Sequence, residues 1–355
     1  MLGFWIMAIG TFLFIPAAYI RTYSVFLTGL FIIGIGLAIL QTAANPYITI
    51  LGPTESAARR ISVMGVFNKG AGIIAPILLA AVILRPDDSE VFRELHLLAP
   101  EAKDALLDGL IRRVILPYGV LTTILVLLGI IVHFSPLPEI DTETEKGEVL
   151  AANADKKSIF EFPYLILGAL AIFLHVGTQV IAVDTIIGYA DSMNIGITKA
   201  KVFPSFVLFT TICGYFLGIL LIPKYISQLT VLKICTFMGL SFSLLILFVN
   251  GNVSLFGFDT HISIWFVVLL GLANSLIWAG IWPLALNGLG RFTKLGASIL
   301  IMGLCGNAIL PLIYGKIADL YSVRAAYIVL IPCYLYLIFY AVKGHQIIRW
   351  KAKAL

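Results

Sequence analysis

Apolar residues form ten long runs along the chain, each close to the length of roughly 20 residues that a helix needs to cross a bilayer. The runs lie at 2–20, 24–51, 61–84, 114–135, 163–189, 202–223, 229–250, 263–288, 296–318 and 323–343. This pattern predicts an all-α membrane protein with about ten transmembrane helices. The first run, Leu2 to Ile20, has no charged segment before it and no obvious small-residue cleavage site, so we expect a membrane helix rather than a signal peptide.

A polar segment at 136–160 divides the runs into four and six. It begins Pro136-Leu137-Pro138-Glu139 and is rich in Glu, Asp and Lys. We therefore predict a four-helix N-terminal bundle at 1–135, a cytoplasmic linker at 136–160 and a six-helix C-terminal bundle at 161–355.

A spaced pattern of proline, Met-Gly and asparagine occurs in both predicted bundles, six helices apart. The first copy is Pro46, Met64-Gly65 and Asn68, and the second is Pro283, Met302-Gly303 and Asn307. A parallel repeat of six helices is typical of transporters with two six-helix halves. On this scheme the first half lacks two helices at its N-terminal side. The alternative is a chance coincidence in a very apolar chain.

Composition agrees with a membrane location, since 60% of the residues are hydrophobic and only 12% are charged. Mean hydropathy is +1.01, which excludes an ordinary soluble domain. Basic residues gather in alternate loops, and such loops face the cytoplasm. With an even number of spans, we expect both termini to be cytoplasmic. No basic patch resembles a nucleic-acid surface, and the four cysteines lack the spacing of a metal site.

Polar residues interrupt one apolar run, in the stretch Gln41-Thr42-Ala43-Ala44-Asn45-Pro46-Tyr47. Amides inside hydrocarbon cost free energy unless they find partners, and the proline frees a backbone carbonyl one turn earlier. Such a segment is tolerated where it faces protein or a water-filled cavity. The stretch therefore predicts a binding site within a membrane protein.

The same stretch, followed by Leu51-Gly52-Pro53 and Phe67-Asn68, resembles the signature region of the fucose–galactose–glucose:proton symporter family of the major facilitator superfamily. The later segment 293–298, Thr-Lys-Leu-Gly-Ala-Ser, is also similar to that family. The resemblance covers most of the chain and begins where the third family helix would begin. It implies a major facilitator fold of twelve helices in two bundles, with helices three to twelve present here, and a central sugar site reached by alternating access.

The chain departs from the proton-coupled pattern of this family at Gln41. Well-known members have a glutamate immediately before Thr-Ala-Ala-Asn-Pro, whereas a glutamine cannot take up or release a proton near neutral pH. Another acidic residue important in proton-coupled members belongs to the first family helix, which the chain lacks. Coupling to H⁺ or Na⁺ elsewhere, or no coupling at all, are the remaining possibilities.

Polar residues of the first bundle supply the first candidates for a sugar site. Gln41 and Asn45 are one helical turn apart, and their amides suit sugar hydroxyls. Asn45 has an alternative role, which is to satisfy backbone freed by Pro46. Asn68 matches a family asparagine. The neighbouring Lys69 lies deep in its span, either as an ion-coupling group or extending to the inner interface.

The seventh family helix carries His175, Thr178 and Gln179 on one face, and Asp184 lies nearer its outer end. Gln179 corresponds to an amide or acid of the family, so we predict that it binds sugar. A lone membrane histidine is more often a packed residue than a proton relay. Asp184 is the only acid well inside an apolar run, which makes it the leading candidate for ion coupling; the alternative is a solvated interfacial carboxylate.

The tenth family helix has Asn274, Trp278 and Trp282 at four-residue spacing. Indole rings stack on the C–H faces of sugars, so we predict that Asn274 and Trp278 bind substrate. Trp282 is closer to the inner end of its span and fits an interfacial or core position better. Asn307, the repeat counterpart of Asn68, is a weaker substrate-site candidate.

The prediction is a secondary transporter of a neutral monosaccharide in a bacterial inner membrane, a monomer without a cofactor. The candidate amides and carboxylate offer hard oxygen ligands, so Na⁺ is an alternative to H⁺ as the coupling ion. An uncoupled facilitator, a sugar sensor and a non-transporting fragment are the alternative functions. A membrane-embedded enzyme is disfavoured because the chain shows no His/Glu metal spacing, no Asp-rich diphosphate cluster and no nucleophile–base pair on one face.

Overall fold

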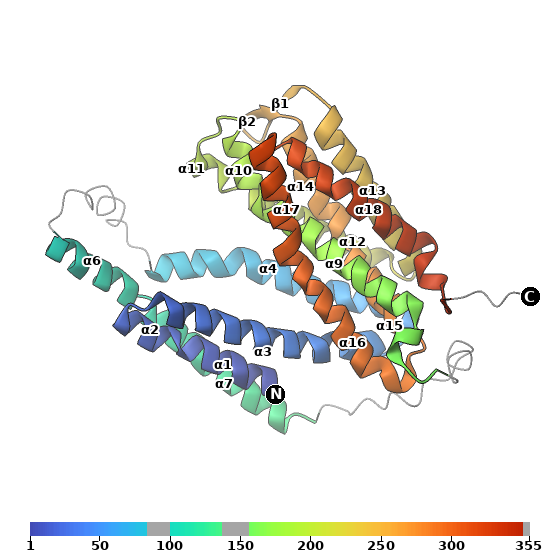
Figure 1. The fold of residues 1–355 in the computed structure, drawn as a ribbon, viewed down its shortest axis with the longest axis horizontal. Helices are drawn as coiled ribbons and strands as arrows, with labels where there is room; N and C mark the ends of the chain where they lie inside the picture. Colours follow the sequence, from blue (N-terminus) through green and yellow to red (C-terminus); the bar gives the residue numbers. More distant parts are fainter. Residues whose placement is uncertain (84–99, 137–155, 351–355) are drawn as a thin grey trace, which may run out of the picture. The chain divides into compact units, whose positions relative to one another are not determined.

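The computed structural model describes residues 1–83, 100–136 and 156–350. Within these ranges ten segments are long and apolar enough to cross a membrane, which confirms the predicted spans and the helical fold class. The helices are α1 (Leu2–Phe12), α2 (Phe14–Ile20), α3 (Tyr23–Ile50), α4 (Ala57–Ile83), α6 (Pro100–Arg112), α7 (Ile115–Phe134), α9 (Pro163–Asp184), α10 (Ile186–Asp191), α11 (Ile197–Ala200), α12 (Phe203–Leu221), α13 (Gln228–Phe248), α14 (Ser263–Asn274), α15 (Ile277–Leu286), α16 (Thr293–Met302), α17 (Gly306–Leu320) and α18 (Leu330–Val342) (Figure 1).

The chain divides by contacts into two compact units. The first comprises Met1–Ala44 and Ala71–Glu139, and the second comprises Asn45–Gly70 and Ile140–Leu355. Helices α3 and α4 each contribute residues to both units. The four-plus-six division at the 136–160 linker stays a prediction, and most of that linker lies outside the described residues.

Glycine pairs bring α1 and α3 of the first unit into close contact. A Cβ atom on Gly36 would lie 2.7 Å from the carbonyl oxygen of Gly3, and one on Gly29 would lie 2.8 Å from that of Gly10. Helix α1 also packs along α7, where Thr122 donates a hydrogen bond of 2.9 Å to Thr11. Gly29 and Gly36 of α3 are therefore required, because a side chain at either position would overlap the backbone of α1.

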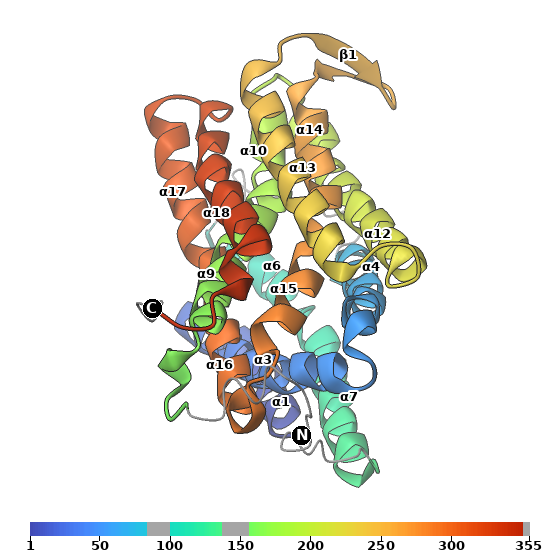
Figure 2. The ribbon, with the colours of Figure 1, turned by 90° about the vertical axis from the view of Figure 1, so that its right-hand side faces the viewer.

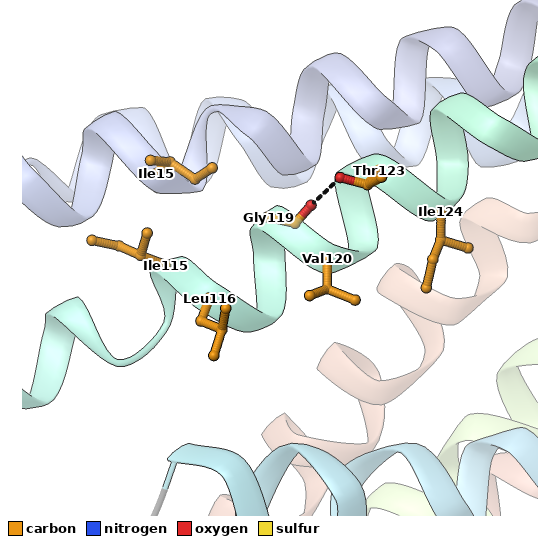
Figure 3. Close-up of a pocket in the computed structure, with 7 residues that line it drawn as sticks. All are labelled: Ile15, Ile115, Leu116, Gly119, Val120, Thr123 and Ile124. Carbon is orange, nitrogen blue, oxygen red and sulfur yellow. Dashed lines mark hydrogen bonds between the residues drawn. The ribbon is translucent and has the colours of Figure 1, made fainter.

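The same unit has an open apolar groove of about 520 Å³ beside α2 and α7. Figure 3 shows Ile15 of α2 opposite the α7 residues that line it. The hydroxyl of Thr123 donates to the carbonyl of Gly119 on its own helix, at 2.9 Å, so the groove offers little polar chemistry. It does not resemble a sugar site.

Helix α9 is the centre of the second unit. It packs against α12, α14, α15, α16, α17 and α18, and its residues Ile172 and Ile181 are completely buried. Close approach is again made by glycines: a Cβ on Gly306 would lie 1.9 Å from the Phe173 carbonyl oxygen, and one on Gly303 would lie 2.8 Å from that of Ala169. The α9 backbone is thus in direct contact with the segment that joins α16 and α17.

Two predicted spans of this unit are discontinuous. The span from Ser263 to Leu286 is interrupted after Asn274, where Leu276 has φ −104° and ψ 3°. The span from Gly290 to Leu320 contains a 3-10 turn at Gly303–Cys305 between α16 and α17. The mean hydropathies of the two spans, 2.0 and 1.9, give no sign of either interruption.

A small β-hairpin joins α13 to α14, made of β1 (Asn252–Leu255) and β2 (Phe258–His261). Figure 2 shows it beyond the ends of these two helices. The sequence did not predict it. At its base, Nδ1 of His261 accepts from the Ser263 N–H at 3.3 Å and lies 2.7 Å from the Ser263 hydroxyl. Burial, together with the nearby charge of Arg324, lowers the pKa of His261 below its ordinary value of 6.5.

Replacing Gly36 with alanine should destabilise the first unit by about 1–3 kcal/mol, because the new methyl group would overlap α1. Gly34→Ala is the matched control, since nothing lies within 4 Å of a Cβ there and alanine favours helix by roughly 0.5–1 kcal/mol. Thermal unfolding of the two purified variants in detergent should therefore move in opposite directions. Equal midpoints would contradict the close packing of α1 and α3.

The hairpin base should weaken as the pH falls below about 6.5. In the window between the lowered pKa of folded His261 and its unfolded value, the unfolded chain binds more protons, so stability rises with pH there. Protonation at Nδ1 also removes the acceptor of the Ser263 N–H. Unfolding midpoints measured from pH 5 to 8 should show this slope in the wild type and a smaller slope in His261→Gln. The same slope in both proteins would exclude His261 as its source.

Candidate functional site

The candidate site of the second unit is built around Asn274, the last residue of α14, at the point where the span is interrupted. This residue is 1% exposed. Its Oδ1 accepts a hydrogen bond of 3.2 Å from the hydroxyl of Thr178 on α9 and one of 2.9 Å from the hydroxyl of Tyr334 on α18. Three separate elements therefore meet at one amide.

The Tyr334 hydroxyl is the main group that orients this amide, because the single proton of the Thr178 hydroxyl is shared between Asn274 Oδ1 at 3.2 Å and the His175 carbonyl oxygen at 2.7 Å. Because Oδ1 is already occupied, the remaining polar group is the Nδ2 donor, which is buried without a hydrogen-bond partner in the described part of the chain. A buried donor left unpaired costs about 1–3 kcal/mol. Asn274 is thus held so that it can donate to an oxygen acceptor.

Three further buried polar atoms of this unit have no hydrogen-bond partner among the described residues: Nδ2 of Asn45, Nδ1 of His175 and Nε1 of Trp282. His175 lies on the same helix as Thr178, whose hydroxyl also contacts the His175 carbonyl oxygen at 2.7 Å. Trp282 is completely buried, so of its two predicted positions it occupies the core and not the interface. The interior of the second unit therefore has several polar groups that only an added molecule or a rearrangement could pair.

Trp278 lies in the first turn of α15, just beyond the interruption, and is partly exposed. Its ring centroid is 5.5 Å from that of Trp282, and the planes are tilted by 47°. The buried indole supports the more accessible one. An accessible indole beside a buried amide is a suitable arrangement for a ligand with both a C–H face and hydroxyl groups.

The other α9 candidates differ in their exposure. Gln179 follows Thr178 directly and is partly exposed, while Asp184 ends the helix and is exposed. Asp184 therefore lies at the edge of the span rather than within its buried interior. The predicted apolar run to 189 is divided there, because α10 begins at Ile186.

Asn307 is in the first turn of α17, immediately after the 3-10 turn, and its side chain is exposed. Exposed amides are costly against lipid, so an amide at this depth is expected to face an aqueous cavity. Asn307, predicted from the repeat, and Asn274, predicted from the tenth family helix, thus each lie next to a helix interruption. Interrupted membrane helices are where transporters commonly form substrate sites.

Asn45, Asn68 and Lys69 also belong to the second unit. Asn45 is buried, and its Nδ2 has no partner among the described residues. No described hydrogen bond joins the Asn45 side chain to the backbone carbonyl freed by Pro46, so this donor is left for another acceptor. Asn68 is exposed and Lys69 is partly buried. Both residues belong to α4.

Gln41 belongs to the first unit, on the part of α3 that ends at Ala44. It is partly exposed, and its side chain makes no hydrogen bond to another described residue. Its amide is therefore available to a ligand.

The residue that sequence reasoning missed is Tyr334. It is completely buried, and a Cβ on Gly239 of α13 would lie 2.1 Å from its ring, so the absence of a side chain at 239 makes room for the tyrosine. The α18 sequence contains three tyrosines, and nothing in it distinguishes Tyr334 from the other two. Among the described residues no group of His, Cys, Asp or Glu could hold a metal ion.

No protein-family model matches the chain. The chain is 32% identical over 349 residues to the glucose/galactose transporter of Brucella abortus, which covers 97% of this chain and 77% of that protein. The chain belongs to the fucose–galactose–glucose:proton symporter family. It is also 29% identical over 354 residues to a putative glucose/galactose transporter of Helicobacter pylori (97% and 80% covered) and 28% identical over 321 residues to the L-fucose-proton symporter of Escherichia coli (89% and 71% covered).

Among solved structures, the major facilitator superfamily transporter FucP in its outward conformation matches with a TM-score of 0.80. The match covers 96% of this chain and 81% of that one at 24% identity, and it confirms the major facilitator fold. The chain is therefore a multi-pass membrane protein, and its relatives are transporters and not enzymes.

Proposed function

We propose that the chain carries a neutral monosaccharide of the glucose, galactose or fucose kind across a membrane by alternating access. The observation that carries the proposal is the 32% identity, over 97% of the chain, to a protein named as a glucose/galactose transporter. The unpaired amide and the accessible indole at the α14–α15 interruption supply chemistry that suits a sugar.

In this proposal Asn274 donates from Nδ2 to a sugar oxygen, and Trp278 stacks on a C–H face. Gln179 and Asn307, which are accessible amides beside the same elements, add further hydroxyl partners. Asn45 and Asn68 contribute from the segments of α3 and α4 that belong to the second unit. Gln41, a residue of the first unit, is proposed separately as a substrate-binding amide of that unit.

Transport is proposed to be coupled to a cation. Two relatives carry the name L-fucose-proton symporter, yet Gln41 cannot exchange a proton. Asp184 is then the acid that binds H⁺ or Na⁺, because it is accessible at the end of the central helix α9. Lys69 is the second candidate, since it is a partly buried cation inside the membrane span formed by α4. No cofactor enters this scheme.

The proposed setting is a bacterial inner membrane, with the protein as a monomer and both termini in the cytoplasm. The relatives are bacterial. The termini follow from ten spans and from the basic residues in alternate loops.

Vesicles containing the protein should accumulate labelled glucose, galactose or fucose when a proton or sodium gradient is imposed. In Asp184→Asn, accumulation should be lost, whereas sugar exchange without a gradient should persist, because only the coupling group is removed. Asp191→Asn is the matched control, an exposed acid beyond the same helix, and should accumulate sugar normally. Uptake that ignores every gradient would indicate a facilitator, and no binding or uptake of any sugar would contradict the transport proposal.

Tyr334→Phe should weaken sugar binding by several-fold, because Asn274 would lose one of the two hydroxyls that hold its amide. Tyr336→Phe is the control on the same helix, since its hydroxyl donates to the Leu167 carbonyl oxygen of α9 at 3.1 Å. Each variant should lose about 0.5–1.5 kcal/mol of stability. Equal sugar affinity in the two variants would show that Tyr334 has no positioning role.

A further inference from the structure

The hairpin between α13 and α14 has one polar and one apolar face. Residues alternate across a strand pair, and the pairing sets Asn252 opposite His261 and Ser254 opposite Asp259 on one face. On the other face, Val253 is opposite Thr260 and Leu255 is opposite Phe258. A two-stranded ribbon has no core of its own; here Phe258 packs on Phe203 and Phe206 of α12, whereas Leu255, at the turn end of the same face, is 41% exposed.

The turn of this hairpin places an aromatic residue where the backbone disfavours it. Phe256 has φ +52° and Gly257 has φ +80°, which is the left-handed pair of a type I′ turn. Asn-Gly and Asp-Gly are the favoured sequences there, and a bulky residue at positive φ is strained. Phe256 is nevertheless 78% exposed, so most of its side chain is left uncovered by the protein.

Aromatic side chains continue from this turn onto the ends of the neighbouring helices. The Phe256 ring is 5.7 Å from Phe206 of α12 and 5.6 Å from Trp265 of α14. From Phe206 an apolar stripe runs along α12 at helical spacing through Phe209, Phe216 and Leu220, which are 61%, 51% and 68% exposed. Such a stripe on a membrane span faces lipid.

We propose that the hairpin is a membrane-interface anchor, with Phe256 and Leu255 inserted among the lipid headgroups and upper acyl chains at the end of α12. The bilayer is the occupant because the exposed aromatic turn continues the lipid-facing stripe without a break. Aromatic residues favour this depth. Ser254 and Asp259, on the opposite face, then lie toward water.

The orientation can be measured with spin labels on the full-length protein in phosphatidylcholine–phosphatidylglycerol vesicles, after its four cysteines are replaced. Labels at Leu255→Cys and Ser254→Cys are compared for collision with oxygen, which concentrates in lipid, and with a water-soluble nickel chelate. The label at 255 should favour oxygen, and the label at 254 should favour nickel. Equal, high nickel accessibility at both positions would overturn the proposal.

Substitutions at Phe256 separate anchoring from folding. Phe256→Asn creates the favoured Asn-Gly turn, so its unfolding midpoint in detergent should stay or rise, while nickel accessibility at position 255 should increase several-fold in vesicles. Phe256→Trp should keep the label in lipid. Tyr321→Asn removes a 79% exposed aromatic elsewhere in this unit. It should leave the nickel accessibility of the label at position 255 unchanged. If the nickel accessibility of the label at position 255 is the same in Phe256→Asn as in the parent protein, Phe256 does not anchor the hairpin.

Discussion

The structure of the second unit depends on how a buried amide is paired at an interrupted membrane helix. Polar groups within an apolar interior must find partners, and Asn274 receives two, from Thr178 and Tyr334. These hydrogen bonds join α14 to α9 and α18 at the point where the α14 backbone stops being helical. They also leave the Nδ2 donor unpaired, so the same interaction that supports the fold prepares a binding group.

Close helix packing makes this arrangement tolerable. Gly303 and Gly306 allow the second interrupted span to contact the backbone of α9, and Gly239 makes room for the Tyr334 ring. A small apolar cavity of about 120 Å³ lies beside the α14–α15 interruption, where Leu272, Ser275 and Leu276 line it with α12 and α13 residues. The interruption is thus held by hydrogen bonds on one side and has free volume on the other, which suits a segment that changes conformation during transport.

Sequence reasoning predicted the spans well because bilayer thickness gives each helix a length and a composition. It also selected Asn274 and Trp278 as candidates, since a mid-span amide and an indole one turn later are conspicuous in an apolar run; their role in binding sugar stays a prediction. It did not predict the interruption after Asn274, because no glycine or proline occupies positions 274–276. Nor did it find Tyr334, whose role depends on the packing of α18 against α13. The hairpin was missed because its strands are only four residues long.

The most direct test of the account is equilibrium binding of labelled glucose, galactose and fucose to the purified protein, compared with Asn274→Ala. The control is Asn287→Ala, an exposed asparagine at the far end of α15. If Nδ2 of Asn274 donates to the sugar, its removal should weaken binding of the preferred sugar about tenfold, which corresponds to about 1.4 kcal/mol. The control should bind with wild-type affinity. Unchanged affinity in Asn274→Ala, or the same loss in both variants, would contradict the assignment of the sugar site to this interrupted helix.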